Sequence, residues 1–333
     1  MVSPIRKEEK MVTEVKSART RPLSDDAQTD LETEQEQAKA KQVRLLVAFA
    51  YVVCCLVWST TYYVVRQTVL PTAGVAPYYS AAIRFLLAVA IFIPIWLIFV
   101  RQHRTPTMRE LIWISGAGVL NGLNQICVYG SEQQISGGLA AVLAATTPLM
   151  VALLAILTRT EKVSSRTVLG FVVCFIGVGL VCHDRLQVSI AQAFAALLML
   201  ASSFFNACSA VTLKRSTIAL NPIVAATIFL AVTAVPIWIT SVCRGEPQFA
   251  AIPTQPMLGI VYLAVMSSVV AFGLYLFMMK HVKLMTISTL PFVIPVLALV
   301  VDLFLEKSFV MTTESWIGCF VVLAGVVYSI VHR

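Results

Sequence analysis

Long apolar runs separated by short polar segments fill the chain from residue 43 onward. A helix needs about 20 apolar residues to cross the hydrocarbon core of a bilayer, which is roughly 30 Å thick. Ten runs meet this length within tolerance, so the pattern predicts an all-α integral membrane protein with ten transmembrane helices. The predicted spans are residues 45–65, 77–100, 110–131, 138–157, 167–183, 190–213, 222–243, 257–279, 286–305 and 315–331. Since most connectors are shorter than about ten residues, consecutive helices are expected to be antiparallel neighbours.

An internal repeat relates the two halves of the chain. The segment Gly137–Cys182 returns in edited form as Met285–Val331, each copy with a proline in an apolar run, an acidic residue and a Gly-x6-Gly-Val motif. The matching positions are Pro148 with Pro295, Glu161 with Glu306, Gly170 with Gly318 and Gly177 with Gly325. Their spacings are 147, 145, 148 and 148 residues, so we expect a shorter first helix and a longer connector in the second copy.

Each half holds five spans, and an odd number forces the second copy to cross the membrane in the opposite sense. We therefore expect two inverted five-helix repeats, residues 43–185 and 186–333, with a solute site near the bilayer midplane between them. Residues 1–42 are rich in Glu, Gln, Lys and Thr, which predicts a disordered cytoplasmic tail with at most a short helix near residues 30–41.

Composition and charge exclude a water-soluble globule, because 58% of the 333 residues are hydrophobic and 13% are charged. The first 42 residues carry eight basic and nine acidic side chains, which leaves 17 basic and 8 acidic residues for the membrane part. With the N-terminus inside, twelve basic residues flank the cytoplasmic ends of spans and four flank the outer ends. This bias predicts cytoplasmic N- and C-termini for a multi-pass protein of the cell (plasma or inner) membrane. Nothing in the charge distribution suggests nucleic-acid binding.

Polar side chains recur on one face of several spans, where they need a partner or water. Asn121, Gln125 and Tyr129 form the richest such stripe, at i, i+4 and i+8. The expected solute-binding residues are Trp58, Thr61, Tyr62, Arg84, Asn121, Gln125, Tyr129, Ser202, Asn206, Ser267 and Tyr275. The alternative is that Ser, Thr and Asn side chains join helices by hydrogen bonds and that the aromatic side chains only pack.

Two charged residues lie within predicted spans. Arg84 either holds a solute carboxylate by a two-pronged hydrogen bond or extends outward and caps carbonyls of a neighbouring helix. Its counterpart in the second half lies near apolar Phe229, so the halves are not equivalent here. Asp302 either couples transport to protons or is a solvated carboxylate that pairs with Lys307.

Three prolines are expected to allow gating. Pro148, Pro291 and Pro295 remove backbone hydrogen bonds from spans four and nine and so permit kinks that open one face at a time.

The chain resembles the EamA-type ten-helix transporters of the drug/metabolite transporter superfamily over residues 45–331. The residues that carry this resemblance are Trp58-Ser59-Thr60 with Arg66, Ala81 to Phe85, Gly138 to Val142, Pro148, Glu161, Ser267-Ser268, Pro295 and Glu306. Ser59 stands where the family usually has glycine. The resemblance implies export or exchange of small metabolites, often amino acids, at a site lined by spans one, three, four, six, eight and nine.

The sequence thus predicts a secondary transporter that exports small metabolites by alternating access, with amino acids as the leading solute. A channel-like facilitator is the main alternative. A receptor or scaffold, and an intramembrane enzyme, are further alternatives that do not explain an inverted repeat. There is no Gly-x4-Gly-Lys loop for ATP, no HExxH and no clustered histidines, so we expect no enzyme activity, no cofactor and no metal. The expected partners are a small-molecule solute and membrane lipids, and the oligomeric state is left open, with a monomer compatible with the pattern.

Overall fold

The computed structural model describes residues 25–100, 105–135, 140, 143–159, 164–182, 190–216, 220–305 and 313–331. Every regular element in these ranges is a helix. The chain divides into two compact units, Met1–Leu46 and Val47–Arg333.

In the N-terminal unit, the described residues are helical rather than disordered. Helix α2 begins at Asp25 and ends at Val69, so residues 25–42 do not form the expected flexible tail. The cause is local: Ala, Lys, Glu and Gln are strong helix formers, and no Gly or Pro interrupts the chain between Asp25 and Val69. The first predicted span therefore continues toward the N-terminus as one helix. Residues 1–24 lie outside the described residues.

The helices of the larger unit follow the predicted spans closely. Single helices coincide with six of those spans within a few residues: α3 Pro77–Val100, α4 Met108–Ser131, α7 Ser165–Cys182, α8 Ile190–Ser216, α9 Pro222–Cys243 and α14 Thr313–Val331. Span eight is a continuous run of α10 Thr254–Tyr262, the π-helix η3 Leu263–Ala271 and α11 Phe272–His281. A short 3-10 turn, η1 Pro71–Ala73, connects α2 to α3. Within the described residues, 6 helices are long and apolar enough to cross a membrane. The all-helical membrane architecture is confirmed, and the count of ten crossings stays a prediction.

Helix starts are explained by their capping residues. Thr107 accepts a hydrogen bond from the Glu110 backbone amide, and the Glu110 side chain accepts one from the Thr107 amide, which is a capping box before α4. Asn221 caps α9 by accepting from the Ile223 amide, with Pro222 in the first turn.

Spans four and nine are each broken by a turn. Helix α6, Thr147–Leu157, starts after a turn at residues 145–146. Helix α12, Leu284–Ile287, is separated from α13, Leu290–Leu305, by a turn at residues 288–289.

The two breaks have the same hydrogen bonds at a spacing of 143 residues. The Thr146 amide donates to the Leu143 carbonyl at 3.1 Å, and the Thr289 amide donates to the Thr286 carbonyl at 3.2 Å. The hydroxyls of the two threonines also donate to these same carbonyls. Pro148 is therefore the counterpart of Pro291, and the pairing of Pro148 with Pro295 that the sequence suggested is wrong. The second copy has the longer helix after the break, not the shorter one: α13 has 16 residues and α6 has 11.

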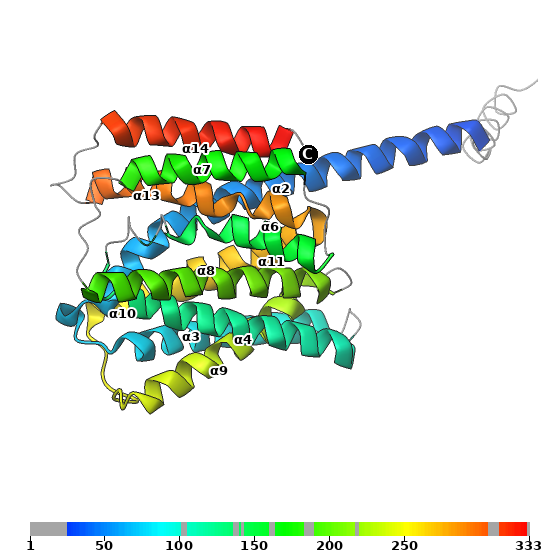
Figure 1. Cartoon of the computed structure of the whole chain (residues 1–333). Helices are drawn as coiled ribbons and strands as arrows, with labels where there is room; N and C mark the ends of the chain where they lie inside the picture. Colours follow the sequence, from blue (N-terminus) through cyan, green and yellow to red (C-terminus); the bar gives the residue numbers. More distant parts are fainter. Residues whose placement is uncertain are drawn as a thin grey trace, which may run out of the picture. The chain divides into compact units, whose positions relative to one another are not determined.

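Helices α7 and α14, the last of each half, lie side by side and run antiparallel (Figure 1). A Cβ built on Gly177 would lie 2.9 Å from the Gly318 carbonyl oxygen, and one on Gly325 would lie 2.9 Å from the Gly170 carbonyl oxygen. These two contacts exchange residues 148 apart, as a two-fold axis between the helices requires. The small residues allow the backbones to approach closely, which is a common way to pack helices in lipid.

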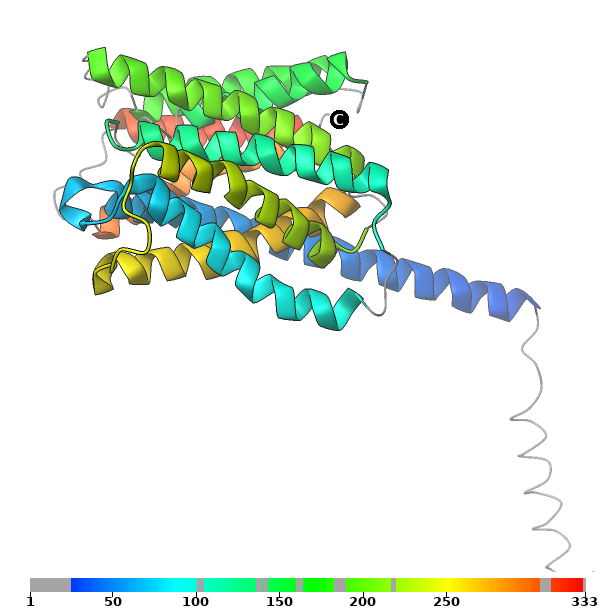
Figure 2. The same ribbon diagram turned by 90° about the horizontal axis from the view of Figure 1, so that it is seen from below.

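Helix α4 packs between α8 and α9, and the seams are again made by small or polar residues (Figure 2). A Cβ on Gly118 would lie 2.9 Å from the Phe229 carbonyl oxygen of α9, and a Cβ on Gly122 would overlap Pro236. On the other side, the Ser209 hydroxyl of α8 donates to the Ala117 carbonyl at 2.8 Å.

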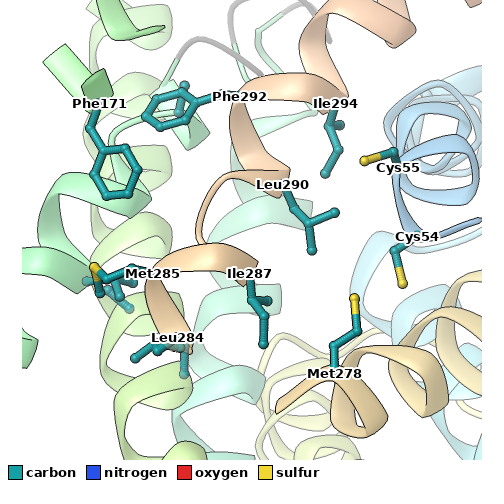
Figure 3. Close-up of a cluster of buried hydrophobic side chains, with 14 of the residues drawn as sticks. Cys54, Cys55, Phe171, Met278, Leu284, Met285, Ile287, Leu290, Phe292 and Ile294 are labelled. Atoms are coloured by element: carbon teal, nitrogen blue, oxygen red, sulfur yellow. The ribbon is translucent and has the colours of Figure 1, made fainter. Parts of the chain in front are cut away.

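An apolar cluster surrounds the break in span nine (Figure 3). Phe292, just after the turn, packs against Phe171 of α7 with ring centroids 5.5 Å apart. Leu290 and Ile294 face Cys54 and Cys55 of α2, and these buried thiols are small apolar side chains of the core. This packing holds the short α12 and the start of α13 in place beside the cavity described next.

Candidate solute-binding site

One cavity, with a volume of about 160 Å³, lies inside the larger unit. Its wall includes residues of α2, α4, α6, α8, η3, α11 and α13, with Arg84 of α3 and Phe229 of α9 added. An engineered protein cavity of about 150 Å³ admits benzene, so this volume suits a small solute rather than a peptide or lipid.

The cavity brings together the residues that the sequence singled out, from elements far apart in the chain. Every expected solute-binding residue except Tyr129 lies on its wall. Among the three expected gating prolines, Pro291 is part of the wall, whereas Pro148 and Pro295 are not.

Arg84 is buried, with 2% of its surface exposed, and it does not extend outward. Its Nε donates to the Ser268 hydroxyl at 3.0 Å and its Nη2 to the Ser267 hydroxyl at 2.9 Å. Its Nη1 donates to the Tyr129 hydroxyl at 3.3 Å, so Tyr129 lies behind Arg84 instead of on the wall. None of these acceptors is a carbonyl or a carboxylate, which excludes the carbonyl-capping alternative. A guanidinium has five N–H groups, so two remain for a solute.

The local helix geometry explains how two consecutive serines reach one guanidinium. Ser267 and Ser268 lie in the nine-residue π-helix η3, which is wider than an α-helix and is typical of functional sites. Ser267 also accepts a hydrogen bond from the Thr61 hydroxyl at 3.1 Å, and its carbonyl accepts one from Trp58 Nε1 at 3.4 Å. Helix α2 thereby supports the serine that orients Arg84.

Two amide side chains face the cavity without using their hydrogen-bonding groups. Gln125 of α4 and Asn206 of α8 lie on the wall, are half-buried and make no hydrogen bond with another residue that the structure describes. Asn121 differs, because its amide donates to Thr233 at 3.2 Å and receives a hydrogen bond from Asn124 at 3.4 Å. In the α4 stripe, Asn121 joins helices and Gln125 is available to a solute. Ser202 of α8, also on the wall, donates only to the Met199 sulfur at 3.6 Å.

Aromatic rings form another part of the wall. Trp58 packs against Phe272 and Tyr275 with ring centroids 5.7 Å and 5.6 Å apart, and Phe229 lies 5.7 Å from Phe272. Tyr62 also lines the cavity. These rings supply apolar surface opposite the amides, as in most small-molecule pockets.

Sequence reasoning did not assign Glu132 to the site, although it lies on the cavity wall. The residue is 1% exposed, and neither carboxylate oxygen has a hydrogen-bond partner. It follows the last residue of α4, where burial raises the pKa of its carboxyl to about 8 against the opposing effect of Arg66 and Arg84. The signal in the sequence was its place one turn beyond the polar stripe, but a glutamate at a helix end usually faces water.

Both broken helices meet the cavity at their breaks. Ala144 and Thr147 flank the turn in span four, and Ile287, Ser288 and Leu290 flank the turn in span nine; all five lie on the wall. Pro148 and Pro291 each stand in the first turn of the helix that follows, where a proline removes no helical hydrogen bond. Pro295 lies inside α13, where its ring removes one.

Three acidic residues of the sequence analysis cannot be placed in the site. Glu161 and Glu306 lie outside the described residues, and Asp302 belongs to α13 with its side chain outside the description.

Comparisons with known proteins give one family and a consistent fold. The EamA-like transporter family matches the chain twice, over residues 45–182 and 193–331. The uncharacterized inner membrane transporter YedA of Escherichia coli (strain K12) is 26% identical over 278 residues, which cover 82% of this chain and 86% of YedA. YedA of Escherichia coli O157:H7 matches with the same values. A solved crystal structure aligns with a TM-score of 0.67 and 16% sequence identity over 86% of this chain and 96% of that one, which shows a shared fold.

Proposed function

This chain belongs to the EamA-like transporter family, and from that membership we propose that it is a secondary transporter that exports a small zwitterionic or polar metabolite. Family membership points to a transporter rather than an enzyme. Amino acids are the leading solute class. We place the protein in the plasma or inner membrane with both termini cytoplasmic, on the bias of basic residues toward one side.

The observation that carries this proposal is the meeting of two broken helices, one from each half, at a polar cavity. Discontinuous helices at a repeat interface are where secondary transporters bind solutes, because unwound backbone there is tolerated beside a water-filled cavity. The equal hydrogen bonds at Thr146 and Thr289 make the two breaks equivalent.

The wall chemistry supports a small solute with polar ends and an apolar body. Arg84 keeps two N–H groups free, Gln125 and Asn206 offer uncompensated amides, and Trp58 with Tyr275 offers aromatic surface. A solute with several negative charges would need more cations than Arg84, the only Lys or Arg on the wall.

For the mechanism, we propose that the halves rock about the cavity and that the turns before Pro148 and Pro291 act as hinges. Each turn already lacks regular helical hydrogen bonds, so a change of angle there breaks few contacts. The solute gradient or an ion drives transport, since ATP has no binding loop in this sequence.

A channel-like facilitator is the second candidate, and saturation of flux separates the two. Purified protein in liposomes is assayed with radiolabelled alanine, valine, leucine and threonine. The proposal expects flux of at least one of them to saturate with concentration and to be inhibited by unlabelled solute. Linear flux would favour the facilitator, and absence of flux for every amino acid, sugar and nucleoside tested would overturn the transporter proposal.

A further inference from the structure

The Glu132 carboxylate is a buried acceptor that has no donor. Both of its oxygens lie without a hydrogen-bond partner at a wall position of the cavity. A buried carboxylate in this condition loses its hydration and gains nothing in return, so it either stays protonated or binds a cation.

The helix on which Glu132 stands adds to this preference. Glu132 is the C-cap of α4, and its amide donates to the Val128 carbonyl. The unpaired carbonyls at a helix C-terminus carry partial negative charge, which disfavours an anion and favours a cation there.

The charged and titratable groups around Glu132 do not neutralise it. Arg66 of α2 acts on it through space but donates its own hydrogen bond to the Ile135 carbonyl at 2.7 Å. Arg84 of α3 acts on it in the same way and donates to three hydroxyls. Tyr62 of α2 and Tyr129 of α4 are the neighbouring tyrosines.

On the α8 side of the cavity, Met199 and Ser202 carry no titratable group. Among the described residues around it, Glu132 therefore has distant cations but no proton donor in contact.

Resting on the proposed transport function, we propose that Glu132 binds the ammonium group of a zwitterionic solute whose carboxylate is held by Arg84, and that Glu132 gives up a proton when this solute binds. The cavity has one cation and one carboxylate on its wall, so a zwitterion leaves both compensated. The O–H bond of the Glu132 carboxyl breaks, its proton leaves to water, and the carboxylate accepts hydrogen bonds from the ammonium.

The sign of the pH dependence follows. Glu132 is protonated without solute below its pKa of about 8, and the ammonium needs the ionised form. Affinity should therefore rise about tenfold per pH unit as pH increases toward that pKa and level off above it. A solute without an ammonium group should show no such rise.

Three probes with one branched carbon skeleton test this assignment. L-valine carries both charges, isovalerate lacks the ammonium, and isobutylamine lacks the carboxylate. Their dissociation constants are measured by titration calorimetry on the purified full chain from about pH 6 to pH 9. The wild type should bind L-valine at least about 100-fold more tightly than isovalerate at the upper end, since a charge-assisted pair is lost with the ammonium. Isobutylamine should keep the rise of affinity with pH.

Glu132→Gln keeps the shape of the side chain but cannot ionise. It should bind L-valine no more tightly than the wild type binds isovalerate, without pH dependence. Glu314→Gln, which changes an exposed carboxylate in the first turn of α14, is the control and should behave as the wild type. Circular dichroism and thermal unfolding show whether each variant is folded, and Glu132→Asp, which keeps the charge, should restore part of the pH dependence.

Equal affinity of the wild type for L-valine and isovalerate, no binding of L-valine at any pH, or unchanged pH dependence in Glu132→Gln would each overturn the assignment. The proposed transport function fails separately. If any solute shows saturable flux that Glu132→Gln leaves unchanged, the protein is a transporter and Glu132 is not its ammonium site. If no solute shows saturable flux in the wild type, the transport proposal itself falls.

Discussion

The α7–α14 seam and the cavity are built from the same internal repeat but use it in opposite ways. At the seam, Gly177 and Gly325 make equal contacts with residues 148 positions away from each other's partners. At the cavity, α3 and α9 both begin at a proline, and the eighth residue of each helix is Arg84 in the first half and Phe229 in the second. The seam keeps the symmetry of the duplication, and the cavity has lost it.

This difference separates what holds the halves together from what recognises a solute. A seam between two equivalent helices packs well when both present the same small residues, so symmetry is sufficient for it. A small asymmetric solute has different groups at its two ends, so a site for it needs unlike residues at related positions. The serines of η3, Arg84 and Glu132 therefore carry the specificity, whereas the equivalent breaks at Thr146 and Thr289 carry the motion.

The largest effect is expected at the asymmetric pair. Arg84→Met removes three hydrogen bonds that the guanidinium makes, each worth about 1.5–3 kcal/mol when one partner is charged. Solute affinity should fall by at least about 100-fold, the value of about 2.7 kcal/mol. Phe229→Met, its repeat counterpart, should change affinity by less than about tenfold, since volume-conserving apolar exchanges cost below about 1.5 kcal/mol. Equal losses in both variants, measured by calorimetry, would mean that the asymmetry has no role in recognition.

A smaller effect on stability is expected at the symmetric pair. Gly177→Ala and Gly325→Ala each place a methyl group within 2.9 Å of the facing helix backbone, and overpacking of this kind costs about 1–3 kcal/mol. Both should lower the midpoint of thermal unfolding by similar amounts. Gly179→Ala is the matched control on α7, because nothing lies within 4 Å of a Cβ there. A large drop for one glycine and none for its mate would show that the two sides of the seam are not equivalent.

The helix breaks should affect rate more than affinity. Pro148→Ala and Pro291→Ala allow the preceding turn to become helical, which stiffens the proposed hinge, and should slow transport several-fold with little change in solute binding. Pro295→Ala, inside α13 beyond the break, is the comparison and should slow transport less. Initial rates in proteoliposomes and dissociation constants in detergent give the two quantities. Loss of affinity without loss of rate would move the hinges elsewhere.

Sequence reasoning placed the helices well because their signals are local. Apolar length and short connectors located α3, α4 and α9 to within a few residues, and the polar stripes located almost all of the cavity wall. It mispaired Pro148 with Pro295, because repeat spacing in a sequence carries no information on where a helix breaks. It also overlooked Glu132, since burial of a helix-end carboxylate depends on tertiary packing from α2, α3 and α8.

The smallest effects are expected at the free amides. Gln125→Ala and Asn206→Ala each remove at most one or two neutral hydrogen bonds to a solute, worth about 0.5–1.5 kcal/mol apiece, so affinity should fall about two- to tenfold. Asn121→Ala is the contrast on the same stripe, because its amide bonds to Thr233 and should affect stability instead. Wild-type kinetics in both Gln125→Ala and Asn206→Ala would place the solute in another part of the cavity.

Trans-acceleration in proteoliposomes tests most directly whether two equivalent breaks serve one asymmetric site by alternating access. Liposomes loaded with unlabelled L-valine are diluted into a trace of labelled L-valine, and the label inside is followed in time. A carrier that exposes one site to each side in turn should accumulate label transiently above its equilibrium level, and Arg84→Met should abolish this overshoot. Label that rises only to equilibrium, at a rate independent of the internal solute, would contradict alternating access and indicate a channel.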